Sequence, residues 1–391
     1  APAVGEYIKA KAGLAAIQDP PLGTAHAVLA AKGAMAGFSG EVVVLFGDTP
    51  LIRPETIEAM FALRAARGGM VVLGFTPEDP TDYGRLVEAG GVVTRIVEER
   101  DATDEEKKIR LCNSGVFVAD ATVLFQLLSM VRNENAKGEY YLTDLVGLGR
   151  SAGFATHVAM GEEGEVLGVN SRADLAHAEA AFQARARAAA LEAGVTLVDP
   201  QTVYFSYDTE IEPDVVIEPG VFLGPGVRIA SGARICAFSH CTDAVIGPQA
   251  RVGPFARLRP GARIGEGAHI GNFVEVKNVD VGPGAKANHL AYLGDGVVGA
   301  RANIGAGAIF CNYDGYEKFQ THIGADAFIG SDTALVAPVK VGERAYTGSG
   351  SVITKDVPDG ALALGRARQV EIQGWADQFR VKKRAGKEKK T

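Results

Sequence analysis

Several side chains in the first half of the chain stand where phosphate chemistry is commonly done. Asp48 directly follows the apolar run EVVVLFG, at the point where a strand would end. Ligands of open α/β sheets bind beyond the carboxyl ends of the strands, and a carboxylate there can hold Mg²⁺ beside a phosphate. The segment QDPPLGTAHA places a loop rich in proline and glycine before a helix N-terminus, whose free N–H groups attract anions. An aspartate that only caps a loop would occupy the same place, so position alone leaves both interpretations of Asp48 open.

In the second half, the candidate general base is His289, in the segment KANHLAY. A neutral imidazole takes up protons near physiological pH, although a lone histidine more often has a structural or surface role. Three basic residues, Arg259, Lys277 and Lys318, lie in or beside turns that otherwise favour small side chains. Solvated turn charge is the alternative role for each of them.

A repeat of six residues must position these side chains. From about Val216 to Ile353 the sequence reads IEPGVF, LGPGVR, IASGAR and onward, with an aliphatic anchor in each unit. A period of six suits neither an α-helix nor a flat strand. It predicts a parallel β-helix, in which three hexapeptides form one triangular coil.

The repeat is interrupted twice. The insertion NYDGYEKFQ at Asn312–Gln320 breaks the phase between Phe310 and Ile323, and a second irregularity covers Asn278–Gly296. In solenoids such interruptions loop out on one face and often carry the functional site. We therefore expect the chemistry of this half to gather at these two places.

The segments before the repeat alternate between helical and strand patterns. GTAHAVLAAKGAMAG and PETIEAMFALRAARG are expected to be helices, and EVVVLFGD and GMVVLGFT to be strands buried on both faces of a parallel sheet. One alanine-rich helix is expected from Ser171 to Ala193, with a capping box formed by Ser171 and Asp174 and an end at Gly194. The predicted domains are 1–170, a linker helix over 171–194, the β-helix over 195–365, and a C-terminal arm with a basic tail over 366–391.

Composition excludes several classes of protein. Of 391 residues 47% are apolar and 22% charged, and no apolar run is long enough to span a membrane. Four scattered cysteines form no CxxC pair, which indicates a reduced, cytoplasmic location; Cys236 and Cys241 are expected to face the β-helix interior. The net charge is −7, and Lys382–Lys390, in the basic tail from Arg380, is expected to be a frayed, solvated terminus rather than a nucleic-acid site.

Short motifs in a shared order carry a resemblance that covers essentially the whole chain. The first half contains QxxxLGTAHA, GDTPLI, YGR, IVEERDAT, NSG, GEYYLTD and GVN. The second half contains RLRPGA, NFVEVK, HLAYLGD, NIGAG, CNYDG and GSDTALVAPV. In these motifs the chain resembles the bacterial bifunctional N-acetylglucosamine-1-phosphate uridyltransferases/glucosamine-1-phosphate N-acetyltransferases. The resemblance implies a Rossmann-like α/β nucleotidyltransferase domain followed by a left-handed parallel β-helix.

For the α/β domain, the resemblance implies transfer of uridylyl from UTP to N-acetylglucosamine 1-phosphate with release of pyrophosphate. Residues implied to contact the uracil and ribose side of UTP are Gln18, Gly23 and Thr24. Those implied to bind N-acetylglucosamine 1-phosphate are Gly84, Glu98, Asn113 and Thr143. Asp48 and Asn170 would hold Mg²⁺ over the phosphates.

The sequence departs from the family at its start. The family opens with a glycine-rich loop of the LAAGxGTRM type followed by a lysine, and nothing of that kind precedes Ala1. We therefore expect this chain to begin partway into a domain and to be an incomplete version of a longer protein. If the chain acts alone, we expect negligible uridyltransferase activity.

For the β-helix, the resemblance implies acetyl transfer from acetyl-CoA to glucosamine 1-phosphate, with His289 as the base. Residues implied to bind the sugar phosphate are Arg259, Lys277, Tyr292, Asn303 and Lys318. Those implied to contact acetyl-CoA are Asn312, Tyr313, Ser331, Ser349 and Arg366. A β-helix coil exposes flat faces rather than a deep pocket, so one chain would make an incomplete site. The resemblance implies a homotrimer with each acetyltransferase site between subunits.

The favoured hypothesis is thus an enzyme that makes UDP-N-acetylglucosamine for cell-envelope precursors. One alternative is another sugar-phosphate nucleotidyltransferase with a structural or regulatory β-helix. A second is a non-catalytic trimeric scaffold. The segments NHLAYLGD and CNYDG favour the enzyme, since a purely structural coil has no use for them.

Overall fold

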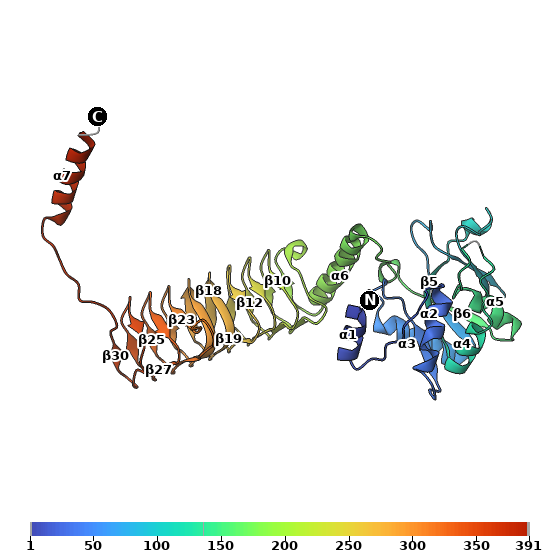
Figure 1. The fold of residues 1–391 in the computed structure, drawn as a ribbon, viewed down its shortest axis with the longest axis horizontal. Helices are drawn as coiled ribbons and strands as arrows, with labels where there is room; N and C mark the ends of the chain where they lie inside the picture. Colours follow the sequence, from blue (N-terminus) through green and yellow to red (C-terminus); the bar gives the residue numbers. More distant parts are fainter. Residues whose placement is uncertain (1, 136, 389–391) are drawn as a thin grey trace. The chain divides into compact units, whose positions relative to one another are not determined.

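The computed structural model describes residues 2–135 and 137–388 and divides into two compact units, Ala1–Phe182 and Gln183–Thr391 (Figure 1). The first unit is an α/β sheet domain, and the second is a solenoid of parallel strands followed by a C-terminal helix. Within these residues, no helix has the length and apolar content that a bilayer-spanning segment needs.

The sheet of the first unit has six strands within the described residues. Its central path runs β4 (Val92–Val97), β3 (Arg85–Ala89), β5 (Cys112–Asp120), β2 (Met70–Phe75) and β6 (Thr156–Met160), and β1 (Glu41–Val44) pairs with β5. Only β2 and β6 run parallel; β1, β2 and β3 all pair antiparallel with β5. The sheet is therefore mixed.

The two expected buried strands have different outcomes. The predicted burial is confirmed for β2, in which every residue is buried, but its pairing is parallel only with β6 and antiparallel with β5. It is wrong for β1, which runs antiparallel to β5 and contains no fully buried residue. Among the described residues β1 has a strand on one side only, so its apolar side chains lack the cover that a central strand receives. An apolar run alone does not distinguish these two positions.

Helices cover both faces of this sheet. Alternate residues of β2 and β5 point to opposite faces, so Val72 and Phe117 join one core while Val71 and Val118 join the other. The first core is closed by α2 (Thr24–Ala30), α4 (Ala121–Leu128) and α5 (Asp144–Ser151), and the second by α3 (Pro54–Arg67). The remaining helical elements of this unit are α1 (Pro2–Ala10) and the short turns η1 (Ala31–Gly33), η2 (Glu106–Lys108) and η3 (Glu163–Glu165).

The helix ends follow their capping residues. Helix α3 begins at Pro54 and ends before Gly68, whose φ of 70° a side chain would resist. The expected helix over residues 23–37 is shorter than predicted, because α2 ends at Ala30 and gives way to η1. The capping box of α6 (Arg172–Glu192) is confirmed: Ser171 N–H donates to Asp174 at 2.8 Å, and Asp174 N–H donates to the Ser171 hydroxyl at 3.2 Å.

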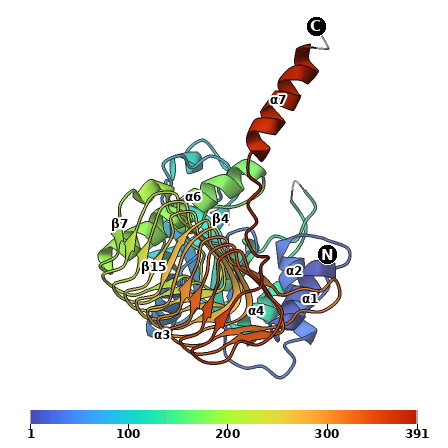
Figure 2. The same cartoon turned by 90° about the vertical axis from the view of Figure 1, so that its left-hand side faces the viewer.

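Three flat faces of short strands form the solenoid, which Figure 2 views end-on. One sheet makes two of these faces and contains β8 (Glu210–Ile211), β10 (Phe222–Leu223), β11 (Arg228–Ile229), β13 (His240–Cys241), β14 (Ala244–Ile246), β16 (Arg257–Leu258), β17 (Ala262–Ile264), β19 (Glu275–Val281), β21 (Tyr292–Val298), β23 (Ile309–Cys311), β24 (Thr321–Ile323), β26 (Ala334–Val336), β27 (Val339–Val341) and β29 (Val352–Ile353). The third face contains β7 (Thr196–Leu197), β9 (Val216–Ile217), β12 (Arg234–Ile235), β15 (Arg251–Val252), β18 (His269–Asn272), β20 (Lys286–His289), β22 (Asn303–Ile304), β25 (Phe328–Ile329), β28 (Tyr346–Thr347) and β30 (Leu362–Ala363). The short turn η4 (Pro200–Thr202) lies between β7 and β8.

The hexapeptide anchors stack inside this prism. Cys241 pairs with Leu258, Leu258 with Val276, and Val276 with Leu293, so each coil takes three hexapeptides or one residue fewer. All four anchors are buried in one continuous core, and Cys236 is buried as well, as expected. Burial raises the pKa of the Cys241 thiol to about 12. The predicted β-helix is thus present, with three hexapeptides to a coil.

Of the two irregularities, one is confirmed. The loop Asn312–Gln320 separates β23 from β24, and the step from Phe310 to its partner Leu335 is therefore much longer than three hexapeptides. Residues 278–296 do not break the solenoid, because they continue through β19, β20 and β21 in register. The coil there is one residue shorter than three hexapeptides, so the sequence phase shifts while the structure stays regular.

The C-terminal arm contains one helix, α7 (Trp375–Glu388). The described side chains from Arg366 to Lys383 are all exposed. The expected frayed terminus is wrong as far as Glu388, where the chain is helical, and Lys389 and Lys390 lie outside the described residues.

Candidate active sites

Four of the predicted sugar-phosphate residues come together in the first unit. Asn113 N–H, on β5, donates to the Gly84 carbonyl at 2.8 Å, just before β3 begins. The Thr143 hydroxyl, at the start of α5, lies 3.4 Å from Glu98, which follows β4. A Cβ on Gly84 would lie 3.5 Å from the Glu98 carboxylate, so the two pairs are neighbours. Burial raises the pKa of Glu98, and the hydrogen bond from Thr143 only partly offsets this effect.

The residues predicted to contact UTP lie against the segment that leads into α5. Gly23 precedes α2 with φ 114°, and a Cβ there would lie 2.6 Å from the Tyr140 carbonyl oxygen, so no side chain fits. Gln18 donates to the Gly23 carbonyl at 3.0 Å. The Thr24 hydroxyl accepts from Leu142 N–H at 2.9 Å. The loop before α2 is therefore fixed to the segment that ends at Thr143.

The two predicted metal ligands are brought close by the backbone. Val169 N–H donates to the Asp48 carbonyl at 2.8 Å, which places Asn170 next to the Asp48 loop. Both residues are exposed. Within residues 2–135 and 137–388 no group of three or more His, Cys, Asp or Glu side chains could hold a metal. A carboxylate and an amide oxygen nevertheless fit Mg²⁺, which commonly takes one or two protein ligands and completes its octahedron with water and phosphate.

A buried ion pair that the sequence analysis did not single out supports this site. The Arg85 guanidinium is 2.6 Å from the Glu99 carboxylate, and the same guanidinium donates to the Tyr83 carbonyl. Arg85 is 2% exposed. Because Arg85 and Glu99 adjoin Gly84 and Glu98 in the chain, their contact fixes the start of β3 against the end of β4.

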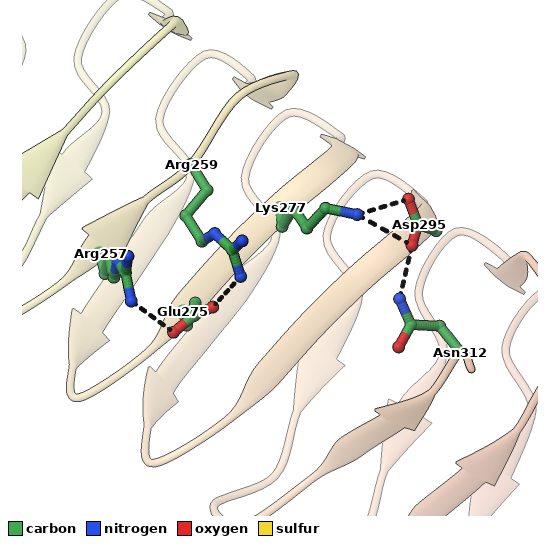
Figure 3. A network of polar contacts seen from close by, with 6 residues as sticks. All are labelled: Arg257, Arg259, Glu275, Lys277, Asp295 and Asn312. Atoms are coloured by element: carbon green, nitrogen blue, oxygen red, sulfur yellow. Dashed lines mark hydrogen bonds and ion pairs between the residues drawn. The ribbon is translucent and has the colours of Figure 1, made fainter. Parts of the chain in front are cut away.

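In the second unit, a charged network lies at one corner of the prism (Figure 3). Glu275 accepts from Arg259 at 2.8 Å and is 3.7 Å from Arg257. Lys277 lies 3.2 Å from Asp295, which also accepts from Asn312 at 2.5 Å. Of these residues only Arg259, Lys277 and Asn312 were predicted from the sequence.

Two further predicted residues border this network. A Cβ on Gly294 would lie 2.5 Å from the Tyr292 hydroxyl and 2.8 Å from the Asn312 amide nitrogen, so these groups meet above Gly294. Lys318 contacts Lys277, and that contact lowers the pKa of Lys318. We call Arg257, Arg259, Glu275, Lys277, Asp295, Asn312 and Lys318 the phosphate cluster.

His289 lies outside the phosphate cluster, at the end of β20. Its Nδ1 is 2.7 Å from the Asn272 Oδ1, in the preceding coil. An amide oxygen can only accept, so in the neutral imidazole Nδ1 carries the proton and Nε2 keeps a free lone pair. His289 is exposed, which leaves that lone pair accessible.

Other predicted acetyl-CoA residues share the position of His289 in later coils. His289, Ser331 and Ser349 each follow a stacked anchor by two residues, the anchors being Ala287, Ile329 and Thr347. Ala306, which the sequence analysis did not single out, holds the same position after Ile304. Arg366 comes one residue past the equivalent position in the last coil. Neighbouring strands are about 4.8 Å apart, so this acyl column (His289, Ala306, Ser331, Ser349 and Arg366) spans about 19 Å.

The acyl column and the phosphate cluster occupy opposite corners of one face. The corner beside His289 is marked by left-handed backbone at Phe273 and Leu290, and the other by Asn278 and Asp295. Residues 289 and 294 are five positions apart, which is on the order of 16 Å of extended chain. Asn303 lies on β22, where it pairs with Lys286 and Phe328, and Tyr313 lies on the loop, where it bridges to Lys318. The structure therefore groups the predicted residues into two sets.

Comparison with known proteins identifies two family matches. The model described as nucleotidyl transferase matches residues 4–157, and that of bacterial transferase hexapeptide (six repeats) matches 243–278 and 320–355. "Bifunctional protein GlmU" of Caulobacter vibrioides is 58% identical over 392 residues, which cover 100% of this chain and 85% of that protein. The protein of the same name from Maricaulis maris is 56% identical over 390 residues, 100% of this chain and 86% of its own length. Two solved structures also match parts of the chain. A UDP-N-acetylglucosamine acyltransferase from Campylobacter jejuni is 16% identical, covers 47% of this chain and 81% of its own, and has a TM-score of 0.32. A putative glucose-1-phosphate thymidylyltransferase from Bacillus anthracis is 18% identical, covers 46% of this chain and 70% of its own, and has a TM-score of 0.36; both scores are too low to carry an argument.

Proposed function

This chain belongs to the family of bifunctional GlmU proteins, and from that premise we propose how its two units divide the synthesis of UDP-N-acetylglucosamine. The second unit transfers acetyl from acetyl-CoA to glucosamine 1-phosphate. The first transfers uridylyl from UTP to the resulting N-acetylglucosamine 1-phosphate. The observation that carries the proposal is that one face of the solenoid bears an exposed imidazole, oriented by Asn272, at one corner and a cluster of cationic side chains at the other.

The phosphate cluster has the charge that a sugar phosphate requires. Four cationic side chains, Arg257, Arg259, Lys277 and Lys318, stand against two carboxylates, Glu275 and Asp295, which leaves two positive charges. A phosphomonoester carries close to two negative charges at neutral pH. Charge-assisted hydrogen bonds from Arg259, Lys277 and Lys318 to the phosphate oxygens are the proposed contacts, with Tyr292 and Asn303 toward the sugar.

His289 is the proposed general base. The bound amine arrives as an ammonium and loses one proton to water. As its nitrogen attacks the acetyl carbonyl carbon, Nε2 of His289 takes the second proton. The carbon–sulfur bond then breaks, and the leaving thiolate takes the proton back from the imidazolium. Asn272 holds the imidazole in the tautomer that this step needs.

The acyl column offers a path for acetyl-CoA. An extended thioester laid along it puts its acetyl end at His289, passes Ser331 and Ser349, and puts its phosphates near Arg366, which is exposed. Asn312 and Tyr313 would border the acyl end from the opposite corner. The exposed ring of Tyr313, at 59% relative exposure, suits such contact.

In the first unit, the sugar-phosphate oxygen attacks the α-phosphorus of UTP in line and pyrophosphate leaves. Glu98, Asn113, Thr143 and the Gly84 backbone would hold the sugar, and Gln18, Gly23 and Thr24 the nucleoside. Asp48 and Asn170 would hold Mg²⁺, whose contribution is charge stabilisation rather than covalent chemistry. Because UTP and acetyl-CoA are cytoplasmic metabolites, the proposed location is the cytoplasm.

The acetyltransferase is proposed to work as a homotrimer. Phe238, Phe255 and Phe273 stack at 5.0 and 5.2 Å along the corner beside His289 and are 57%, 46% and 56% exposed. An exposed aromatic ladder of this kind marks a surface that another chain covers. Three chains in cyclic arrangement would bring the acyl column of one chain to the phosphate cluster of the next.

One reciprocal experiment tests the proposal. We expect His289→Ala to lower acetyl transfer roughly 10²- to 10⁴-fold, the usual contribution of a general base, while binding of N-acetylglucosamine 1-phosphate to the first unit is unchanged. Asp48→Asn should leave acetyl transfer intact. Its effect on pyrophosphate release is measured in a chain that also carries the glycine-rich opening loop of the family, where that release should fall. Acetyl transfer that survives in His289→Ala removes His289 as the base. Wild-type protein that transfers no acetyl at all would instead support the scaffold hypothesis.

A further inference from the structure

Asp295 is a buried carboxylate in the solenoid wall. It lies on β21 at a prism corner, with φ 52° and 5% relative exposure. Burying an ionised carboxylate costs free energy unless partners compensate it. Here burial would raise the pKa of Asp295, but hydrogen bonds from Asn278, Asn312 and Lys277 outweigh it and hold that pKa below its usual value. Asp295 is therefore an anion at neutral pH.

Its partners come from the coils on both sides. Oδ1 accepts from Asn278 at 2.8 Å and from Lys277 at 3.2 Å, both in the preceding coil. Oδ2 accepts from Asn312 at 2.5 Å, in the following coil, and lies 3.3 Å from Lys277. Figure 3 shows the carboxylate between the Lys277 ammonium and the Asn312 amide. One side chain thus fixes two groups that come from different coils.

The solenoid itself does not need this carboxylate. Gly261 and Ala337 occupy the equivalent corner position in other coils, as the backbone bonds from Asn278 N–H to the Pro260 carbonyl and from Ala337 N–H to the Cys311 carbonyl indicate. Neither offers a charge, and the wall continues past both. A buried anion at this one position therefore calls for an explanation beyond coil formation.

We propose that Asp295 is a positioning residue that couples the two substrates of acetyl transfer, holding Lys277 for the sugar phosphate and Asn312 for acetyl-CoA. This inference rests on the proposed function of the second unit. Without the carboxylate, Lys277 would face Lys318 with no counter-ion, and the Asn312 amide would lose its orientation. A group that serves both substrates affects both Michaelis constants together.

The test is Asp295→Asn, which keeps the side-chain shape and tolerates the left-handed backbone. We expect KM for glucosamine 1-phosphate and KM for acetyl-CoA each to rise roughly 5- to 50-fold, as for lost hydrogen bonds to charged groups. A merely structural role would lower the active fraction, and hence kcat, with both KM values unchanged. Lys277→Met should raise only the KM for glucosamine 1-phosphate, and Asn312→Ala should raise only the KM for acetyl-CoA.

The matched control is Asp326→Asn, since Asp326 also sits at a left-handed corner, φ 57°, and pairs with an exposed arginine, Arg301. Neither KM should change in it. If Asp295→Asn does not fold, Asp295→Glu keeps the charge but displaces it, and both KM values should still rise. An active wild type with unchanged KM values in the folded variant overturns the role of Asp295 alone. An inactive wild type overturns the proposed function instead.

Discussion

At the scale of single residues, Glu98 shows how a residue proposed to bind substrate can oppose stability. Its carboxylate is more than half buried and meets one hydrogen-bond donor, Thr143. Folding raises the pKa of Glu98, so the native state holds this proton more tightly than the unfolded chain does. The ionised form therefore destabilises the native state as the pH rises through the folded pKa. Below the unfolded value of about 4.5 the effect is absent.

Replacing this carboxylate should stabilise the first unit in a pH-dependent way. We expect Glu98→Gln to raise the Tm of that unit at pH 7.5 and leave it unchanged at pH 4, while weakening binding of N-acetylglucosamine 1-phosphate. Differential scanning calorimetry at the two pH values measures this. Glu88→Gln, at an exposed position of β3, is the control and should change neither Tm. A Tm for Glu98→Gln that shifts equally at both pH values would contradict the burial argument.

Residue roles were predictable where the resemblance assigned one and not where a role depends on a partner in another coil. His289 and Lys277 stand in the quoted motifs HLAYLGD and NFVEVK. Their partners Asp295 and Asn272 stand in the same two motifs but were given no role, because the contacts form only when coils stack. A signal was present nonetheless: Asn272 stands one coil before His289 in the sequence, and Asp295 stands one coil before Asn312. Reading polar residues at the coil length, rather than the hexapeptide length, would have found both.

At the scale of elements, the inserted loop Asn312–Gln320 is separable from the coil that bears it. Its side chains are exposed except for Asn312, which is buried, and Phe319, which is partly so. The loop makes the step from Phe310 to Leu335 longer than the steps between neighbouring anchors. Removing residues 313–320 restores the step of an ordinary coil and leaves every stacked anchor in place.

We expect this deletion to fold and to lose acetyl transfer. The Tm of the second unit should fall by only a few degrees, because almost no core is removed and shortening a loop changes closure entropy little. Acetyl transfer should drop roughly a hundredfold or more, since the proposed phosphate contact of Lys318 is lost. Tyr316→Ala, in the same loop at 93% exposure, should stay active. Near-wild-type activity of the deletion would remove the loop from the site.

The elements themselves were predictable to different degrees. The six-residue period specifies the solenoid because each anchor must point inward at a fixed place in the coil. The strand β1 was misjudged. An apolar run indicates that its side chains favour burial, but it does not show which elements bury them or in which direction the neighbouring strand runs. The apparent irregularity at residues 278–296 was misjudged because a turn can absorb one residue without disturbing the register.

At the scale of the whole molecule, one chain keeps the two sets of residues proposed for acetyl transfer at opposite corners of a face. Cyclic packing of three chains would join the corner of one to the opposite corner of the next, and so complete three equivalent sites. Each site would then take His289 from one chain and Asn312 from its neighbour. Testing this arrangement requires two different variants in the same trimer.

Two variants with impaired acetyl transfer, assayed with acetyl-CoA well below its raised KM, should complement each other when assembled together. In a trimer that contains both His289→Ala and Asn312→Ala chains, cyclic order leaves one site in three with both residues intact, so about a third of wild-type activity should return. Co-expression with two different affinity tags and sequential purification isolates these mixed particles for assay, and their mass should be three times the 40.9 kDa chain. His289→Ala mixed with Arg366→Ala is the control: both belong to the acyl column of one chain, so every site keeps a defect. Mixed particles as inactive as their parents would mean that each site lies within a single chain.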